Sequence, residues 1–296
     1  MSGIEVVRAG ALTTIQDLGR PGSAHLGVPR SGALDVAAHA LANALVGNPA
    51  GDGVESGDAQ SAATLETTAT GCALRALSEA VVAVTGAPAP VFVGGVAAPH
   101  GSPIRLRAGQ VLDVREPTSG LRSYVGVRGG FRVPAQLGSR STDVLGGVGP
   151  APLKNGDHLP VGPDPATTAP VFAAREPTPA IPAHFELPVI PGPRPEWFAI
   201  DAVRTLHDSS YVVTHRSNRV GLRLYGEPLG HSRDDELPSE GLVLGAIQIP
   251  ADGQPVIFLN DHPTTGGYPV VGVVHPDALP LLAQAPPGAT VRFTRA

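Results

Sequence analysis

Glycine and proline interrupt this chain so often that long regular elements have little room to form. The 296 residues include 37 glycines and 32 prolines, spread along the whole length. Both residues break helices and strands and favour turns. Hydrophobic residues make up 42% and charged residues 16% of the chain, as in globular proteins. The sequence therefore predicts a folded protein of short strands joined by tight turns.

Two segments show helical spacing of apolar residues. The first starts at Val36, with Asp35 placed to cap it and Gly47 placed to end it. The second is expected to start at Pro195, the N1 position of the helix, and to carry Trp197, Phe198, Ala202 and Leu206. Short β-branched runs predict strands near 80–84, 90–93, 104–106, 111–114, 123–127, 211–215, 222–226, 242–250, 255–259, 270–274 and 290–293.

These elements predict a mainly-β architecture in two halves, each with about one clear helix. The N-terminal half covers 1–160 and the C-terminal half 187–296. Residues 161–186 are rich in Pro, Ala and Thr, which predicts an extended connector. No GxGxxG sequence follows a strand and opens a helix, which argues against a Rossmann domain.

Charge and cysteine content exclude several classes of function. The net charge of −5 and pI of about 6.0 predict no binding to nucleic acid or to an anionic membrane. Lys154 is the single lysine and lies in no Walker A motif, so phosphate binding would fall to arginines, backbone N–H groups or a helix N-terminus. Cys72 stands alone and is expected to be a buried, inert thiol. Without a signal-peptide pattern or a long apolar run, we expect a cytoplasmic protein.

Polar residues gather beside glycines in several predicted loops. Arg20, Arg140 and Arg219 each adjoin glycine or a small polar residue in such a loop, where a guanidinium can bind a carboxylate or phosphate bidentately. Structural alternatives exist for their neighbours: Asp17 is suited to an Asx turn and Asn218 to a left-handed turn. No histidines or cysteines have metal-ligand spacing, and we predict no metal site.

Six motifs, in order, closely resemble one family. They are "ALTTIQDLGRPG" with "GVPRSGALD", then "LRSYVGVRGG", "LGSRSTD", "SNRVGLRLYG", "ELPSEGLVLGAIQIPADGQP" and "TTGGYPVV", and the match runs from about residue 4 to 274. The chain resembles the allophanate hydrolase subunit 2 family, whose members are also called C-type 5-oxoprolinase subunits, KipA-like proteins or biotin-dependent carboxyltransferase proteins. One departure is His262-Pro263, where members often carry Arg-Gln before the threonines. This difference leaves the substrate open, and His262 is the one histidine that we would test.

The resemblance implies a cyclophilin-like β-barrel architecture and a partner of the subunit 1 type, which is KipI-like and is also known as the B-type 5-oxoprolinase subunit. A third protein, the A-type 5-oxoprolinase subunit (LamB/YcsF-like), is a further expected partner. ATP and Mg²⁺ are implied for the assembled complex. Covalent biotin is not, because Met1 is the only methionine and no Met-Lys-Met site exists. The motifs then supply the candidate site. The expected catalytic residues are Asp17, Arg20, Arg140, Asn218, Arg219 and Asp261, and the expected substrate-binding residues are Gln16, Ser31, Ser141, Gln248, Thr264, Thr265 and Tyr268.

Three functions remain open from the sequence. The first, which the resemblance favours, is a subunit of an ATP-dependent 5-oxoprolinase that opens 5-oxoproline to glutamate. The second is carboxyl transfer to urea or a similar amide, as in a urea carboxylase or allophanate hydrolase system. The third is a KipA-like protein that binds a kinase inhibitor without catalysis. In the first hypothesis the arginines clamp phosphate, and Arg219→Ala abolishes turnover with the fold intact.

Overall fold

In the computed structural model of the protein, the described residues are 3–48, 61–165, 169–170, 180–233 and 235–296. They group into two compact units. Unit 1 takes its residues from 1–20, 31–143 and 147–181, and unit 2 from 21–30, 144–146 and 182–296. Part of the predicted connector 161–186 lies outside the described residues, at 166–168 and 171–179, and its residues 184–186 belong to a strand of unit 2.

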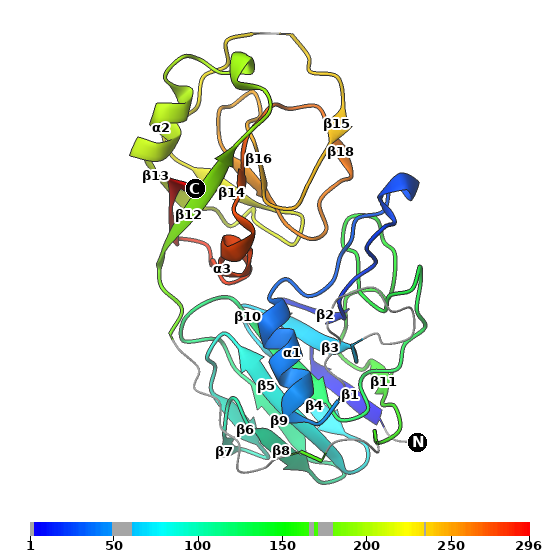
Figure 1. The fold of residues 1–296 in the computed structure, drawn as a ribbon. Coiled ribbons are helices and arrows are strands. Elements are labelled where there is room, and N and C mark those ends of the chain that lie inside the picture. Colours follow the sequence, from blue (N-terminus) through cyan, green and yellow to red (C-terminus); the bar gives the residue numbers. More distant parts are fainter. Residues whose placement is uncertain (1–2, 49–60, 166–168, 171–179, 234) are drawn as a thin grey trace. The chain divides into compact units, whose positions relative to one another are not determined.

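Unit 1 contains two antiparallel sheets (Figure 1). The six-stranded sheet has the order β11 (His158–Pro160), β1 (Gly3–Arg8), β4 (Cys72–Ala76), β9 (Val111–Val114), β6 (Val91–Val93) and β7 (Val96–Ala98). The five-stranded sheet has the order β2 (Leu12–Gln16), β3 (Thr64–Thr68), β10 (Arg122–Val127), β5 (Ala80–Gly86) and β8 (Pro103–Leu106).

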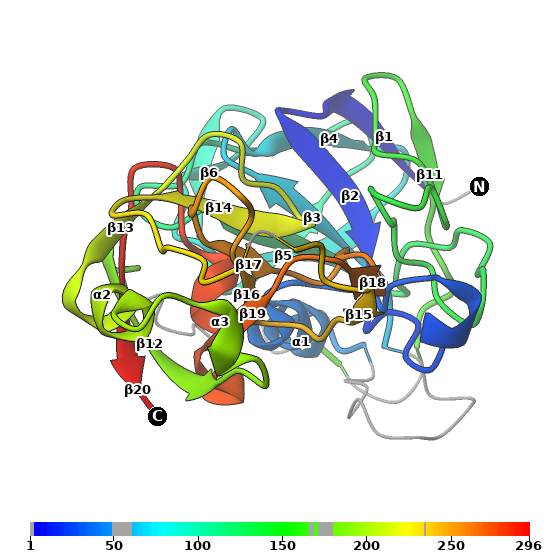
Figure 2. The ribbon, with the colours of Figure 1, turned by 90° about the horizontal axis from the view of Figure 1, so that it is seen from above.

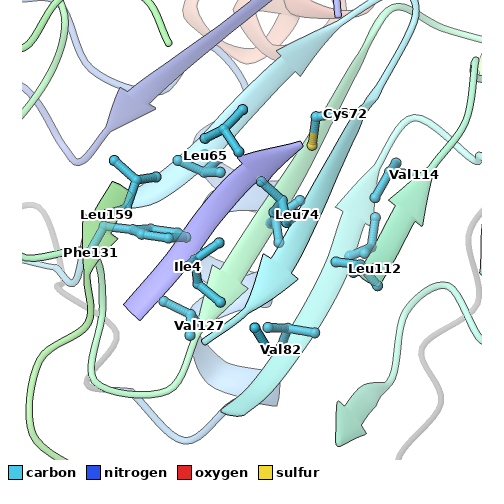
Figure 3. Close-up of a cluster of buried hydrophobic side chains, with 14 of the residues drawn as sticks. Ile4, Leu65, Cys72, Leu74, Val82, Leu112, Val114, Val127, Phe131 and Leu159 are labelled. Carbon is cyan, nitrogen blue, oxygen red and sulfur yellow. The ribbon is translucent and has the colours of Figure 1, made fainter. Parts of the chain in front are cut away.

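Alternating residues of both sheets form the core of unit 1. Figure 3 shows side chains from β1, β4 and β9 together with side chains from β3, β5 and β10 in one apolar cluster. Such a cluster is what two face-to-face sheets bury between them. Cys72 lies within it, and burial raises the pKa of its thiol to about 12, which confirms the prediction of a buried, inert cysteine.

Helix α1 (Val36–Leu45) packs on β10 and β5 (Figure 1). As predicted, the Asp35 carboxylate accepts a hydrogen bond from the Ala38 N–H, and Gly47 follows the helix with a φ of 73°. The close approach depends on Gly126 of β10, because a Cβ there would lie 2.8 Å from the Ala42 carbonyl oxygen. Contact between helix and sheet therefore fixes the segment that follows the "QDLGRPG" loop.

Unit 2 is built on a closed barrel of seven strands. Strand β20 closes it by pairing in parallel with β12 and antiparallel with β13. The order is β12 (His184–Pro191), β19 (Val270–Val274), β16 (Ala246–Gln248), β17 (Val256–Phe258), β14 (Gly221–Tyr225), β13 (Ser210–Val213) and β20 (Thr290–Arg295). The paired strands β15 (Glu240–Gly241) and β18 (Thr265–Gly266) lie side by side in Figure 1 and Figure 2. This barrel and the two sheets of unit 1 confirm the predicted mainly-β architecture.

Helices in unit 2 differ from the predicted one. Pro195–Trp197 forms only a 3₁₀ turn, the backbone becomes extended at Phe198, and α2 spans Ala202–Asp208. The helix is interrupted at Phe198 because this residue forms an isolated β-bridge with His231. The described residues also contain α3 (Leu279–Ala283) and the 3₁₀ turns η1 (Ala24–Leu26) and η3 (Pro276–Ala278). None of the helices in the described part of the chain has the length and apolar character that a membrane crossing requires.

Candidate functional site

The carboxylate of Asp17 is the centre of a buried polar cluster in unit 1. Its Oδ1 accepts hydrogen bonds from the hydroxyls of Ser139 and Ser141, each at 2.6 Å, and from the Gly19 N–H at 2.8 Å. Its Oδ2 accepts from the Arg140 N–H at 2.6 Å. Asp17 is 1% exposed and, among the described residues, has no ion-pair partner. We call Asp17, Gly19, Ser139, Arg140 and Ser141 the Asp17 hub.

Local sequence explains how this hub forms. Strand β2 ends at Gln16, and Asp17 opens a turn in which its own side chain binds the N–H two residues later, as in an Asx turn. In "GSRSTD", two serines lie two residues apart and both hydroxyls reach the same carboxylate. The Ser141 hydroxyl also accepts from the Asp17 N–H at 3.0 Å. One carboxylate thus joins two loops that are more than 120 residues apart in sequence.

The three predicted arginines have different surroundings. Arg20 is 1% exposed, and its Nη2 donates to the Ser141 carbonyl. Arg219 is fully buried in unit 2. Arg140 is half-buried, and its Nε donates to the Val133 carbonyl at 3.1 Å. Arg140 also lines a cavity of about 290 Å³ beside Gly129 and Gly130.

Three buried polar atoms near the Asp17 hub lack a hydrogen-bond partner among the described residues. They are Gln16 Oε1, Ser31 Oγ and Thr142 Oγ1. Their segments are joined: Gln16 Nε2 donates to the Thr142 carbonyl at 3.1 Å, and the Ala33 N–H donates to the Asp17 carbonyl at 2.9 Å. Ser31 also has a φ of 52°, an uncommon conformation for a residue with a side chain. Buried orphan atoms are costly in a folded protein, so this group indicates a place where a water or a ligand completes the network.

Behind β3 lies a network that the sequence did not single out. Glu66 Oε2 accepts from the Tyr124 hydroxyl at 2.7 Å and from the Leu34 N–H at 3.0 Å, and Glu66 Oε1 lies 3.5 Å from Arg122 Nε. Tyr124 in turn accepts from the Asp35 N–H at 2.8 Å. The pKa of Tyr124 is raised well above its usual value, mainly by burial and secondly by the negative charge of Glu66. The network fixes the chain between the first loop and α1.

His39 of α1 belongs to a second buried network. Its Nδ1 is 2.8 Å from Thr64 Oγ1 and its Nε2 is 2.8 Å from Ser61 Oγ. Burial lowers the His39 pKa to about 4, although the charges of Asp17 and Glu66 act in the opposite direction. His39 is therefore neutral at neutral pH, and each ring nitrogen lies within hydrogen-bond distance of a hydroxyl group, as in a packed histidine. Within the described residues, no group of three or more His, Cys, Asp or Glu side chains is arranged to hold a metal ion.

Unit 2 has one buried ion pair among the predicted site residues. Arg219 Nε and Nη2 donate to the two oxygens of Asp261 at 2.9 and 3.1 Å, and both side chains are 0% exposed. Asp261 Oδ2 also accepts from the Val144 N–H at 3.2 Å. Asn218, next to Arg219, is exposed and its Oδ1 accepts from the Val220 and Gly221 N–H groups, which is a turn arrangement.

The remaining predicted residues of unit 2 gather around β18. Gln248 Nε2 donates to the Tyr268 carbonyl at 2.9 Å, and Thr265 belongs to β18 itself. The Tyr268 side chain is half exposed and lines an apolar pocket of about 210 Å³, together with Gly241 and Gly266. Thr264 accepts from the Leu242 N–H through its carbonyl and is half-buried. The predicted residues thus form one group in unit 1 and another in unit 2.

His262, the departure from the family pattern, is turned back on its own backbone. Its Nδ1 lies 2.7 Å from the Pro263 carbonyl oxygen, and its ring lies against that of Phe258. Burial lowers the pKa of His262. These contacts give the residue a packing role beside Asp261.

Similarity to known proteins agrees with these motifs. Residues 26–295 match the family described as carboxyltransferase domain, subdomain A and B. The chain belongs to this family. Its match covers residues of both units, including Ser139, Arg140 and Ser141 of the hub and the Arg219–Asp261 pair, while Asp17 and Gly19 precede its first residue.

Relatives fall into two groups. The C-type 5-oxoprolinase subunit of Escherichia coli is 34% identical over 99% of this chain and 91% of its own length. The urea amidolyase of Saccharomyces cerevisiae is 33% identical over 98% of this chain, but this chain spans only 16% of it. The crystal structure of the K. lactis urea amidolyase matches with a TM-score of 0.88 at 31% identity, covering 99% of this chain and 18% of that one. The fold is thus that of a carboxyltransferase domain.

Proposed function

We propose that this protein is one subunit of a heteromeric, ATP-dependent 5-oxoprolinase, which opens 5-oxo-L-proline to L-glutamate. One observation carries the proposal. The chain aligns with 91% of the C-type 5-oxoprolinase subunit at 34% identity, whereas it matches the urea amidolyase over only 16% of that protein. The assembled enzyme would then be an amide hydrolase acting on a lactam.

The unpartnered atoms beside the Asp17 hub support an amide substrate. A lactam presents one N–H donor and one carbonyl acceptor. Gln16 Oε1 is an acceptor, while the hydroxyls of Ser31 and Thr142 can donate. This set of one acceptor and two donors matches the hydrogen bonds that a cyclic amide needs. Charge that develops on the lactam oxygen would be stabilised by such pre-positioned donors.

Arg140 is the arginine best suited to hold the substrate's carboxylate or a phosphate. Its backbone is fixed by Asp17, while its side chain lines a cavity. Arg219 has a different role in this proposal, because its guanidinium is buried against Asp261. Arg219 acts as a positioning residue that holds the loop of Asp261, rather than as a phosphate clamp. Asp17 positions Arg140 in the same sense.

ATP and Mg²⁺ belong to the assembled complex in this proposal. No group of acidic or histidine side chains in the described residues is arranged for Mg²⁺, so no step is assigned to the ion here. The proposed partners are a KipI-like protein, which is the B-type subunit, and a LamB/YcsF-like protein, which is the A-type subunit. Which subunit carries out each step of the reaction is determined by reconstituting the complex from its separate subunits.

The experiment measures glutamate and ADP release from 5-oxoproline, ATP and Mg²⁺. It is run with this chain alone, with the KipI-like partner, and with the KipI-like and LamB/YcsF-like partners together. Turnover in the full mixture, and none when this chain is omitted, is the expected result. A stable complex that binds its partners but releases no glutamate contradicts the proposal.

A Thr142→Val variant tests the amide site within that assay. Its hydroxyl has no partner in the described structure, so its removal should leave the unfolding midpoint unchanged or slightly higher. We expect the KM for 5-oxoproline to rise by roughly tenfold, the effect of one lost hydrogen bond to the substrate. An unchanged KM would remove Thr142 from the substrate site.

Arg140→Gln is expected to lower kcat/KM by about 100-fold, with exposed Arg216→Gln as its matched control.

Carboxyl transfer is the second candidate function. It is favoured by the family's description and by the TM-score of 0.88 to the urea amidolyase structure. In that case the same cluster would bind urea or a similar amide as acceptor. Transfer of labelled carboxylate from carboxybiotin to urea by this chain and its partners, without glutamate release, would select this function instead.

A further inference from the structure

Unit 2 carries an apolar surface on the outside of its barrel. Ile190 of β12 pairs with Val273 of β19, and Val273 also pairs with Ala246 of β16. Because side chains alternate along a strand and the neighbours Val189 and Val274 are buried in the core, Ile190 and Val273 point outward. Outward positions of an antiparallel sheet that faces water usually carry polar side chains, yet Ile190 is 43% exposed. We call this surface the β19 face, and its residues are Ile190, Pro193, Val243, Tyr268, Val270 and Val273.

A pocket of about 210 Å³ lies within the β19 face. Two of the residues that line it are glycines, and they differ in what requires glycine. A Cβ at Gly266 would lie 2.6 Å from Gln248 Nε2, so packing requires glycine there. A Cβ at Gly241 would meet no atom within 4 Å, and the φ of Gly241 lies outside the left-handed region. Neither packing within the described residues nor backbone conformation therefore requires glycine at position 241, and its missing side chain leaves the pocket open.

Two apolar side chains project beside the pocket. Val243 is 55% exposed and Tyr268 is 50% exposed, and both also line the pocket. Exposed apolar patches on a folded protein mark interaction surfaces, and tyrosine is among the residues that contribute most to the affinity of interfaces. A surface that has a cavity next to projecting apolar side chains is complementary to its own copy. Such complementarity is the requirement for an interface with two-fold symmetry.

The charges at the edge of the β19 face are also complementary to their own copy. Glu240 is the single charged residue among the described residues that line the pocket, and its Oε1 accepts a hydrogen bond from Arg194 Nε at 2.9 Å. Both side chains are partly exposed. In a copy rotated about a two-fold axis, each arginine can approach the glutamate of the other copy. The net charge of −5 makes two chains repel each other overall, so a face with one cation and one anion favours their contact there.

We propose that the β19 face binds a second copy of this chain across a two-fold axis, with the Tyr268 ring of each copy in the pocket of the other. Burial of Ile190 and Val243 around the ring stabilises the dimer, and the Arg194–Glu240 pair at the edge sets its orientation. The occupant is a second copy because the cavity, the projecting ring and the opposite charges all lie on one surface. The association is a property of the full chain by itself and does not depend on the proposed 5-oxoprolinase function.

Sedimentation velocity of the full chain alone, over a range of concentrations, tests the proposal. The mass should rise from 30.1 kDa toward twice that value as the concentration increases. Gly241→Leu fills the pocket and should weaken dimerisation at least about tenfold, whereas non-specific apolar association would become stronger with an added leucine. Tyr268→Ser should weaken dimerisation to a similar extent. The matched control is Tyr225→Ser, which removes a tyrosine that is 68% exposed on β14, outside the β19 face.

A mass of 30.1 kDa at every concentration overturns the proposal. A dimer that Gly241→Leu strengthens or leaves unchanged overturns it too, as does an equal loss of dimer in Tyr268→Ser and Tyr225→Ser. A monomer that instead binds the KipI-like protein, with this binding weakened by Gly241→Leu, also overturns it, because the β19 face then binds a different chain. Thermal unfolding shows that each variant is folded, and Tyr268→Ser with its control decides the question if Gly241→Leu is not.

Discussion

Each unit buries an aspartate, and the two are stabilised in different ways. Asp17 of unit 1 accepts four hydrogen bonds from neutral groups: two hydroxyls and two backbone N–H groups. Asp261 of unit 2 accepts two from the Arg219 guanidinium and one from a backbone N–H. Both aspartates are essentially inaccessible to solvent. One carboxylate is thus held by dipoles and the other by a full opposite charge.

This difference predicts how much stability is lost when one hydrogen-bonding partner of each aspartate is substituted. A carboxylate with four neutral donors loses only part of its stabilisation when one donor is removed. A buried ion pair loses its compensation at once when one partner is removed. Unit 2 should therefore be sensitive to a single change at Arg219, while unit 1 should tolerate a change at any one donor of the Asp17 hub.

The largest expected effect is that of Arg219→Met. It leaves the Asp261 carboxylate buried without a counter-charge and should lower the free energy of unfolding by about 3–5 kcal/mol. Urea unfolding of the purified chain measures it, and Arg223→Met, exposed on β14, is the matched control. This expectation replaces the idea that loss of Arg219 leaves the fold intact. The double variant Arg219→Met/Asp261→Leu should recover much of the loss, because it removes both charges. A cost below about 1 kcal/mol for the single change would mean that Asp261 finds other compensation.

Acid should destabilise unit 1 through His39. Because its folded pKa of about 4 lies below the unfolded value of 6.5, the unfolded chain binds the proton first as pH falls. The stability contribution is complete above pH 6.5 and is lost between pH 6.5 and 4, by about 3 kcal/mol at one unit per 1.36 kcal/mol. Urea unfolding from pH 7.5 to 4 measures the slope, and a His39→Gln variant should show a shallower one. Parallel slopes for the two proteins would show that His39 does not take up the proton on unfolding.

A single change in the Asp17 hub should have a smaller effect. Ser139→Ala removes one of the four hydrogen bonds to the Asp17 carboxylate and should cost about 1–2 kcal/mol, less than the loss of Arg219. Thermal or urea unfolding compares it with Ser139→Thr, which keeps a hydroxyl. A cost as large as that of Arg219→Met would break the contrast between the two aspartates. It would mean that the hub behaves as one cooperative network in which no donor is replaceable.

Features that depend on local sequence were predictable. Asp35, the spacing of α1 and Gly47 act within a few residues of each other, and the structure has the helix where that pattern puts it. Most predicted strands also correspond to strands of the two units, since alternation and turn residues act locally. The helix expected from Pro195 was wrong in its first turns, because Phe198 pairs with a residue far along the chain.

Long-range partners were not predictable from one sequence. Arg219 was chosen for its loop, but its burial depends on Asp261, 42 residues later. The serines of "LGSRSTD" were recognised as polar loop residues, yet nothing in the spacing indicated that Ser139 would join Ser141 on Asp17, 122 residues earlier. Thr142 could not be predicted as a site residue, because it stands out only by its buried hydroxyl, which lacks a hydrogen-bond partner among the described residues. Such signals exist only in three dimensions.

The smallest expected effect on stability is that of substituting Asn218, the exposed neighbour of Arg219. The substitutions distinguish a role in shaping the turn from a role in the reaction. Its Oδ1 accepts from the Val220 and Gly221 N–H groups, so Asn218→Ala should cost only about 0.5–1 kcal/mol, as for a lost local turn bond. Asn218→Asp keeps the acceptor and should restore the stability. Turnover of the reconstituted complex should stay near wild type in both variants if Asn218 only shapes the turn that presents Arg219. A loss of turnover in Asn218→Asp, at restored stability, would show that the amide itself takes part in the reaction. The exposed turn of Asn218, beside the buried Arg219–Asp261 pair, would then belong to the site. The contrast between a structural centre in unit 2 and a substrate-binding centre in unit 1 would no longer hold.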